Sequence, residues 1–453
     1  MMLEVPCVDT GNVLDSRPVS VKKGLKCPPV LLFGHSDHSP NPKHEVNSVE
    51  HKQHFRVVIV GGGAAGISTA AHLVSAGIKD IAVIEPSDTH YYQPFWTFVG
   101  GGVVNAEAST RPMASVMPKG VEWIQARVER FDPDNQRVTT HEGQDIAYDY
   151  LVVAPGLQID WHKIAGLPEA LGKQGVSSNY RYDLAPVTWA NIQSFKGGNA
   201  VFTFPPPPIK CAGAPQKIMY LAEDYFRKQG IRDKSRVIYY CATPSIFSVP
   251  KYATALTGQV IKPRGIETFF RHDLVEVRGE AKEAVFRNLQ TAEDVVQPYD
   301  LLHVVPPMSA PDFIKQSPLA NETGWVDVNQ QTLQHSRYPN IFSLGDASSL
   351  PTSKTAAAIR AQMPVLTANL LASMNGGQMV AEYDGYTSCP LITAYGKLIL
   401  AEFDYDLNPK ETFPFDQSQE RYSMYLLKRY IIPMIYWDGL LKGKRWPGFE
   451  IGP

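Results

Sequence analysis

The stretch HFRVVIVGGGAAGISTAAHLVSAG, His54 to Gly77, decides the fold. Its first part, Phe55–Val60, is a short apolar run rich in β-branched residues, as a buried parallel strand requires. Three glycines follow in the pattern G-x-G-x-x-G, and Ile67–Ser75 then has helical composition. Such a strand, turn and helix predict a backbone that approaches a pyrophosphate, with the helix N-terminus directed at the phosphates.

An acidic residue completes this pattern. The apolar strand Ile81–Ile84 ends in Glu85, whose carboxylate is expected to accept hydrogen bonds from ribose hydroxyls. A glycine-rich loop without a ligand is the alternative, but the order of strand, glycines, helix, strand and acid favours a dinucleotide site. The candidate binding residues from this stretch are Gly61, Gly63, Ala64, Gly66 and Glu85.

Composition narrows the class of protein. The chain has 453 residues, which is too long for one ordinary core and favours two or three domains. With 44% hydrophobic and 19% charged residues it is globular, and its net charge of -2 lacks the basic excess of a nucleic-acid-binding protein. Five scattered cysteines do not form a disulfide scaffold, and no spacing indicates a metal site. No apolar run is long enough to span a bilayer.

Two later stretches, YDYLVVAPG at 148–156 and YPNIFSLGDAS at 338–348, resemble turns of the flavoprotein disulfide reductase superfamily. The resemblance implies FAD near Ala154 and Gly156, although Pro155 stands where the superfamily usually has threonine. It also implies that Asp346, after Gly345, contacts the ribityl or pyrophosphate part. The helix expected at 355–371 is then directed at the flavin, whose reduced form a helix dipole stabilises.

The second half of the chain lacks the corresponding nucleotide motif. The apolar strand at 237–240 runs into CATPS, and the strand at 200–204 runs into PPPP, so neither is followed by glycines. A pyrophosphate is not expected to approach either backbone. We therefore expect a domain that keeps the fold but does not bind NAD(P)H, and an electron donor that reaches the flavin by another route.

Two cysteines are candidates for that route. Cys211 lies after the prolines and before a helix with Pro215 in its first turn, where the pKa of a thiol is lowered. Cys389 lies between Ser388 and Pro390, before an apolar stretch. Each is alternatively a small buried hydrophobic residue, as Cys241 is expected to be. The missing nucleotide motif favours the redox interpretation.

The resemblance becomes specific in five segments: KCAGAPQKIMYL, GDASSLPTSKTAAAIRAQ, DGYTSCPLITAYGKLILAEFDY, ETFPFDQSQERYSMYLLK and HYYQPFWTFVGGG. They are similar to the mitochondrial sulfide:quinone oxidoreductases of animals, over about residues 54 to 440. The similarity is weaker at the N-terminus, in RAQMPVLTANLL, in the strand that ends at Cys241 and after Pro447.

This resemblance implies a mechanism. Cys211 and Cys389 would form the redox pair, bridged at rest by a disulfide or by an extra sulfur. Attack by hydrogen sulfide would leave a persulfide on Cys389 and free the Cys211 thiolate to reduce FAD. Glutathione, sulfite or a second sulfide would remove the sulfur, and the electrons would pass to ubiquinone. Lys217 is expected to attract sulfide and stabilise thiolate, unless it is a solvated lysine.

The resemblance implies three further FAD contacts, at Gln93, Val128 and Lys354, although Lys354 is alternatively a surface lysine at a helix start. It places the protein peripherally on the mitochondrial inner membrane, with a homodimer left open. The C-terminal stretch Glu420–Phe449 mixes aromatic and basic residues, which favours a helix pair in the membrane interface, kinked at Pro433 and carrying the basic pair Lys428 and Arg429. A helix packed on its own domain is the alternative.

The expected fold class is α/β, with two Rossmann-like, three-layer dinucleotide-binding domains and a C-terminal helical membrane-interface region. We expect a processed or poorly ordered leader at 1–53, an FAD-binding domain at 54–165 and 311–385, a second Rossmann-like domain with a degenerate NAD site at 166–310, and a redox-cysteine and membrane-associating segment at 386–453. Two competing functions remain. A type II NADH:quinone dehydrogenase needs a second glycine motif, and a non-enzymatic FAD-binding signalling protein needs neither cysteine.

Overall fold

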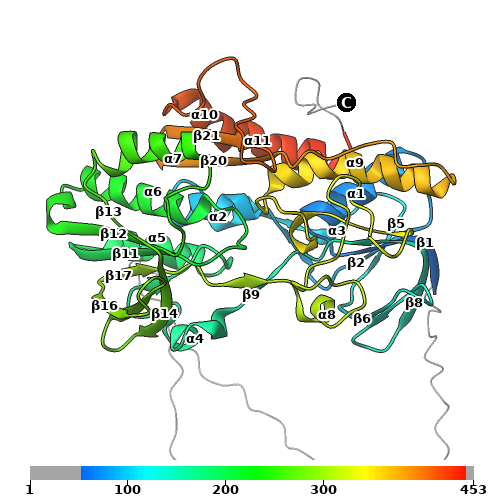
Figure 1. The fold of residues 1–453 in the computed structure, drawn as a ribbon, viewed down its shortest axis with the longest axis horizontal. Helices are drawn as coiled ribbons and strands as arrows, with labels where there is room; N and C mark the ends of the chain where they lie inside the picture. Colours follow the sequence, from blue (N-terminus) through cyan, green and yellow to red (C-terminus); the bar gives the residue numbers. More distant parts are fainter. Residues whose placement is uncertain (1–52, 445–453) are drawn as a thin grey trace, which may run out of the picture. The chain divides into compact units, whose positions relative to one another are not determined.

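Two large sheets organise the protein, the first mainly parallel with antiparallel pairing of β6, β7 and β8, and the second entirely parallel (Figure 1). The computed structural model describes residues 53–444. The first sheet has seven strands in the order β5-β2-β1-β8-β7-β6, with β19 paired to β8. Its strands are β1 (His54–Val60), β2 (Ile81–Ile84), β5 (Val121–Ile124), β6 (Val128–Asp132), β7 (Arg137–Thr140), β8 (Asp145–Val153) and β19 (Ile341–Ser343). The expected α/β class is confirmed.

The glycine turn explains why this sheet forms where it does. β1 and β2 pair in parallel, and helix α1 (Ala64–Ser75) starts directly after the turn. Gly61 has a φ of +103°, and a Cβ there would lie 2.5 Å from the carbonyl oxygen of Ala154. A Cβ at Gly66 would lie 1.8 Å from the carbonyl oxygen of Gly61. Only glycine permits this conformation and this close packing of helix on strand.

The second sheet is entirely parallel, in the order β10-β17-β11-β12-β13. Its strands are β10 (Val176–Ser177), β11 (Gly198–Phe204), β12 (Ser235–Cys241), β13 (Glu267–Phe270) and β17 (Leu301–His303). A three-stranded antiparallel sheet of β14 (His272–Arg278), β15 (Glu283–Asn288) and β16 (Asp294–Pro298) adjoins it. Cys241 ends β12 and is buried, as expected.

Three later elements complete the core. Helix α6 (Ala214–Lys228) follows β11, and helix α9 (Ala356–Met374) packs against α1 (Figure 1). The hairpin of β20 (Thr387–Ala394) and β21 (Lys397–Phe403) packs against both α6 and α9. In the chain, β19 follows all strands of the second sheet but pairs in the first sheet. We therefore propose the division into segments that the sequence suggested. Residues 1–52 and 445–453 lie outside the described residues.

The C-terminal segment differs from the expected helix pair. The chain is helical without a break over this segment, but the helix type changes along it. The consecutive elements are α10 (Tyr422–Leu426), η7 (Leu427–Ile431), α11 (Ile432–Met434), η8 (Ile435–Gly439) and η9 (Leu440–Lys442). Two of these, η7 and η8, are π-helical and flank Pro433, whose missing N–H is accommodated where the hydrogen-bond register changes. Within residues 53–444 no helix is long and apolar enough to cross a membrane.

Candidate active site

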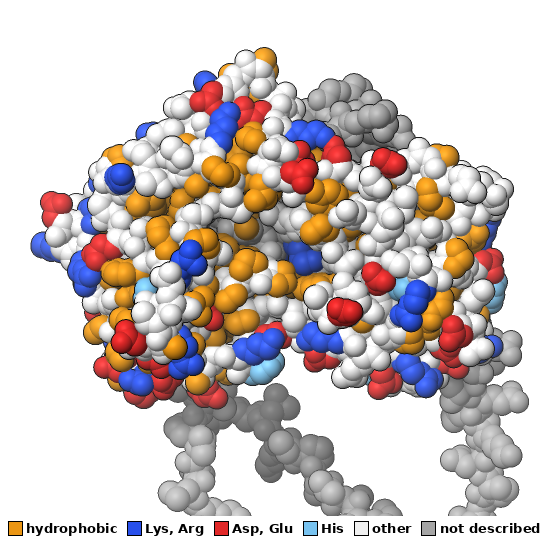
Figure 2. Space-filling view, in the orientation of Figure 1, with side chains coloured by type: hydrophobic (Ala, Val, Ile, Leu, Met, Phe, Trp, Pro, Cys, Tyr) orange, Lys and Arg blue, Asp and Glu red, His pale blue; other side chains and the backbone are white. Residues whose placement is uncertain are grey.

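A cavity of about 510 Å³ is lined by residues from Gly62 to Leu440, which are far apart in the chain. Its wall begins at the glycine turn and Glu85, passes Ala154 and Asp346, and reaches Cys211 and the C-terminal segment. On the face drawn in Figure 2, hydrophobic side chains surround a hollow that contains basic side-chain atoms. A cavity of this size, mostly apolar with a few convergent polar groups, is typical of a cofactor and substrate site.

The glycine end of the cavity is ordered by hydrogen bonds. The Glu85 carboxylate accepts from the backbone N of Gly62 at 2.7 Å and of Ser87 at 2.8 Å, and still lines the cavity. His90 joins this turn to the C-terminal segment, because its Nδ1 lies 2.9 Å from the Gly62 carbonyl oxygen and its Nε2 2.6 Å from the Tyr436 hydroxyl. Burial lowers the pKa of His90 to about 4, so the ring is neutral at pH 7.

Helix α9 presents its N-terminus to the same cavity. Thr355 caps it, its Oγ1 accepting from the backbone N of Ala358 at 3.0 Å. Lys354 precedes the cap and is only 8% exposed, so the alternative of a surface lysine is wrong. Its Nζ lies 3.9 Å from the Trp325 ring, and burial lowers its pKa to about 8. Burial also raises the pKa of Asp346, against the opposing attraction of Lys354.

The loop that carries Cys211 is fixed by the loop before α9. The backbone N of Cys211 donates to the carbonyl oxygen of Lys354 at 2.8 Å, and Cys211 has a φ of +56°. A non-glycine residue in this left-handed region is strained and marks a position held by its surroundings. The preceding Lys210 extends its Nζ to Gln93 Oε1 at 2.7 Å, and burial lowers its pKa to about 8.

Cys389 lies beside the Cys211 loop, although 178 residues separate the two cysteines in the chain: a Cβ added at Gly213 would lie 3.4 Å from the Cys389 Cβ. Both are free thiols, Cys389 fully buried and Cys211 half-buried at the cavity wall. The neighbouring Cys389 thiol and the ammonium of Lys217 hold the pKa of Cys211 well below its usual value. The neighbouring Cys211, together with burial, raises the pKa of Cys389. Of the two sulfurs, that of Cys211 is the one whose surroundings favour the thiolate form.

Lys217 and Lys428 supply the positive charge beside that thiolate. The Nζ of Lys217 donates to Cys211 Sγ at 3.3 Å, and the residue is 4% exposed, which contradicts the alternative of a solvated lysine. Lys428 is 5% exposed and lines the cavity, so its assignment to a basic membrane-facing pair was wrong. Burial and the nearby Lys217 lower the pKa of Lys428 to about 7, against the pull of Cys211.

The remaining sequence-predicted residues divide into two groups. Gly63, Ala64, Ala154, Gly156 and Gln93 line the cavity. Gly61, Gly66 and Gly345 stand behind that wall and shape it, Gly345 donating its backbone N to Gln362 at 2.8 Å. Val128 is a buried residue at the start of β6 and is not part of the cavity lining, so its contact with a cofactor stays a prediction.

Sequence reasoning missed several groups on the wall, including Trp96, Asn179 and Lys428. The indole Nε1 of Trp96 and both amide atoms of Asn179 are buried and have no hydrogen-bond partner among the described residues. Buried polar atoms are normally paired, so these atoms are suited to a bound molecule with donors and acceptors at its edge. The glycine turn, the free lone pairs of Glu85 and these unpaired atoms together fit a flavin dinucleotide.

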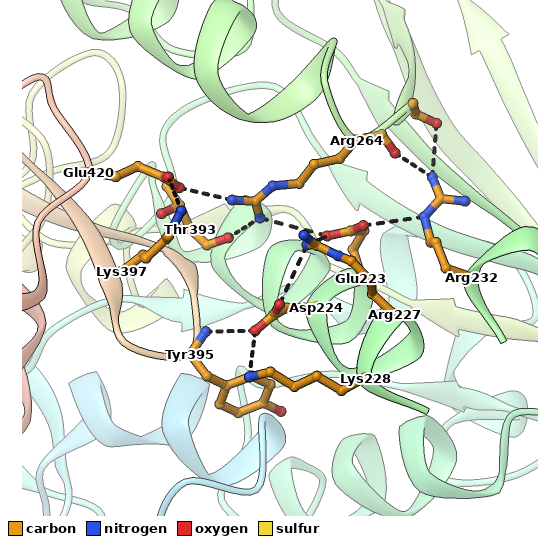
Figure 3. Close-up of polar contacts among 11 residues, drawn as sticks. Glu223, Asp224, Arg227, Lys228, Arg232, Arg264, Thr393, Tyr395, Lys397 and Glu420 are labelled. Atoms are coloured by element: carbon orange, nitrogen blue, oxygen red, sulfur yellow. Dashed lines mark hydrogen bonds and ion pairs between the residues drawn. The ribbon is translucent and has the colours of Figure 1, made fainter. Parts of the chain in front are cut away.

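An ionic cluster holds the Cys389 hairpin against α6 (Figure 3). Arg264 lies at its centre, with Nη2 2.8 Å from Glu420 Oε1, Nη1 3.7 Å from Glu223 Oε2, and a hydrogen bond to the Thr393 carbonyl oxygen. Asp224 of α6 accepts from the backbone N of Tyr395, just after β20, at 3.0 Å. The other members are Arg227, Lys228, Arg232 and Lys397. The cluster thereby couples the two elements that carry Lys217 and Cys389.

We expect Glu420→Gln to loosen this coupling. It removes the charge that binds Arg264 at 2.8 Å and Lys397 at 2.9 Å, and hydrogen bonds to charged groups contribute about 1.5–3 kcal/mol each. Because glutamine keeps one acceptor, the free energy of unfolding should fall by about 1–2 kcal/mol. Urea denaturation measures this loss, and Glu322→Gln, at an exposed acid, is the control. An unchanged midpoint for Glu420→Gln would contradict a stabilising role.

Comparisons with known proteins agree on one family. Residues 55–187 match the family model described as pyridine nucleotide-disulphide oxidoreductase. The mitochondrial sulfide:quinone oxidoreductase of Mus musculus is 48% identical over 415 residues, covering 91% of this chain and 92% of that protein. Its counterpart in Dictyostelium discoideum is 50% identical over 397 residues, covering 87% of each. The crystal structure of the Aquifex aeolicus sulfide:quinone oxidoreductase shares the fold, with a TM-score of 0.72 at 20% identity, covering 86% of this chain and 92% of that one.

Proposed function

The chain belongs to the family of mitochondrial sulfide:quinone oxidoreductases, flavin-dependent enzymes, and from this premise we propose that Cys211 and Cys389 carry electrons from hydrogen sulfide towards ubiquinone. The single observation that supports this assignment is that Cys389 packs against the loop of Cys211, which lines the cavity that starts at the glycine turn. We infer FAD as the cofactor and the mitochondrion, named for these relatives, as the location.

FAD is held, in this proposal, by the glycine turn, Glu85, Asp346 and the start of α9. When bound, FAD supplies the two-electron chemistry between the thiol pair and the quinone. The chain's own residues prepare that exchange. Lys354 and the capped N-terminus of α9 place positive potential at one end of the cavity, which favours a reduced, negatively charged ring system.

The sulfur chemistry rests on the asymmetry of the two cysteines. The neighbouring Cys389 and the ammonium of Lys217 favour the thiolate form of Cys211, and a stabilised thiolate is also a good leaving group. When the pair is bridged, by a disulfide or an extra sulfur, hydrosulfide attack at Cys389 therefore expels Cys211 and leaves the persulfide on Cys389. Glutathione, sulfite or a second sulfide then removes the outer sulfur.

Access for the quinone is the third part of the proposal. The cavity wall near the C-terminal segment is apolar and includes Phe413, Leu427 and Ile432. On the outside, the same segment exposes Tyr422 at 64%, Tyr430 at 55% and Met434 at 38%. Exposed aromatic and aliphatic side chains of this kind suit the interface of a membrane. We propose that this segment docks on the inner membrane surface, where ubiquinone enters, and that a homodimer is compatible with this docking.

Steady-state turnover tests the proposed function. The purified FAD-loaded protein should reduce a ubiquinone analogue when sulfide and glutathione or sulfite are supplied, since the thiol pair is the electron entry. NADH in place of sulfide should give no reduction, because the loops after β11 and β12 carry no glycine motif. Quinone reduction by NADH without sulfide would contradict the proposal and favour an NADH:quinone dehydrogenase. No reduction by either donor would favour a non-enzymatic role.

A further inference from the structure

A buried carboxylate lies on the cavity wall beside the cysteine site. Glu402 belongs to β21, is 4% exposed and pairs across the hairpin with Ser388, the neighbour of Cys389. It lines the cavity together with Tyr386 and Thr412. The electron-transfer scheme above gives this acid no part.

Four neutral groups hold the carboxylate. The Tyr386 hydroxyl donates to Oε1, as does Thr412 Oγ1 at 3.0 Å, while the backbone N of Thr412 and Gln417 Nε2 donate to Oε2 at 2.8 and 2.7 Å. Two of these donors are hydroxyls, which rotate and can accept as well as donate. Protonation of Glu402 is therefore accommodated by turning one hydroxyl, without moving the backbone. The arrangement suits an acid that gains and loses a proton.

The reaction requires such a group. Sulfide and a thiolate acceptor react as HS⁻ + RS⁻ → RSS⁻ + H⁺ + 2e⁻, and the quinone reacts as Q + 2e⁻ + 2H⁺ → QH₂. The sum takes up one proton from solvent for each turnover, and both quinol protons must be placed on oxygens inside the cavity. An apolar wall at Phe413, directly after Thr412, adjoins Glu402 and suits a quinone ring.

We propose that Glu402, with the hydroxyls of Tyr386 and Thr412, forms a proton-delivery site for the quinone. A proton on the Glu402 carboxyl passes to a hydroxyl oxygen, and that hydroxyl gives its own proton to the quinone oxygen as the quinone accepts the electron pair. This route supplies one of the two quinol protons, and the other is the proton that the sulfide half-reaction releases. Glu402 remains as a carboxylate and takes a new proton from water after quinol leaves. This inference rests on the proposed function, because it presupposes quinone reduction in this cavity.

Other charged or titratable side chains lie near Glu402. Arg360 of α9 lies 6.0 Å from the Tyr386 ring. The Tyr252 hydroxyl of α7 (Pro250–Leu256) donates a hydrogen bond to the Glu411 carboxylate at 3.0 Å and accepts one from the backbone N of Glu402 at 3.3 Å. Lys251 pairs with Glu411 at 2.7 Å. Glu411 itself is not part of the cavity lining, so it provides a matched control one residue from Thr412.

Separate half-reactions test the proposal. In the FAD-loaded Glu402→Gln protein, anaerobic sulfide should reduce the flavin at the wild-type rate, because the cysteine pair is intact. Reoxidation of the reduced flavin by a water-soluble ubiquinone analogue should be slower by about 10²-fold, the usual contribution of a general acid. Glu411→Gln should reoxidise like wild type.

Three results would overturn the proposal: reoxidation by Glu402→Gln at the wild-type rate, equal slowing of flavin reduction and flavin reoxidation in Glu402→Gln, or equal slowing of reoxidation in Glu411→Gln. If Glu402→Gln does not fold, Glu402→Asp decides, because a carboxyl one methylene shorter is displaced from the Tyr386 and Thr412 hydroxyls and should slow reoxidation, so reoxidation at the wild-type rate contradicts the proposal. A wild-type flavin that sulfide does not reduce would instead refute the proposed function, so the two failures are distinguishable.

Discussion

Replacing either Cys211 or Cys389 with serine should lower sulfide-dependent quinone reduction by at least about 10³-fold, because a serine hydroxyl forms neither a stable anion nor a disulfide at neutral pH. FAD should stay bound, since the substitution leaves the glycine turn, Glu85 and the backbone hydrogen bond from residue 211 to Lys354 unchanged. The double variant should be hardly worse than either single one, because residues that act as a unit have non-additive effects. Steady-state turnover with a ubiquinone analogue measures the loss.

Cys241→Ser is the matched control for these variants. Cys241 is also buried, at the end of β12, but its Sγ lies 2.9 Å from Thr243 Oγ1 and it does not line the cavity. Its replacement should leave turnover nearly unchanged. Substantial turnover in Cys211→Ser or in Cys389→Ser would remove that cysteine from the mechanism.

Lys217→Met should raise the pKa of the Cys211 thiol and slow flavin reduction by sulfide. The ammonium lies 3.3 Å from the sulfur and is buried, and a hydrogen bond to a charged group contributes about 1.5–3 kcal/mol, or about 10- to 100-fold in rate. The sign follows from the lowered pKa: Lys217 is one of the groups that lower it, so the Cys211 thiol of the variant should ionise at higher pH than that of the wild type. Alkylation of Cys211 by iodoacetamide, followed against pH in the reduced protein, measures the shift.

Two further variants serve as controls for Lys217→Met. Lys217→Arg keeps a positive charge and should restore part of the thiolate. Lys228→Met removes an exposed lysine from the same helix, where it pairs with Asp224 at 2.9 Å, and should leave the Cys211 profile unchanged. An unshifted alkylation profile in Lys217→Met would show that the neighbouring Cys389, and not Lys217, stabilises the thiolate.

The sequence predicted the local parts of the fold well. The strand at 81–84, the glycine turn and the acid after it were identified correctly because each follows from residues within one short stretch. The helix after the second turn begins at Ala356, capped by Thr355, within one residue of the expected start. Local sequence signals of this kind directly constrain dihedral angles and hydrogen bonds.

The site was less predictable because it joins segments that are remote in the chain. Nothing near Cys211 indicates Cys389, and only the family resemblance suggested the pair. Lys428 has the composition of a surface lysine, yet packing of the C-terminal segment over the cavity buries it beside Lys217. In the sequence Glu402 is one acid in an apolar strand, and its four donors come from three residues in two other segments, at 386 and at 412–417. Tertiary packing, rather than local pattern, decides the surroundings of such groups.

Anaerobic addition of sulfide to the oxidised, FAD-loaded protein tests most directly the claim that electrons enter through the Cys211 and Cys389 pair. The proposed function predicts a long-wavelength charge-transfer band followed by bleaching of the flavin absorbance. Both signals should be absent from Cys211→Ser and Cys389→Ser at unchanged FAD content. Flavin bleaching by sulfide at the wild-type rate in either variant, or bleaching by NADH alone, would contradict it.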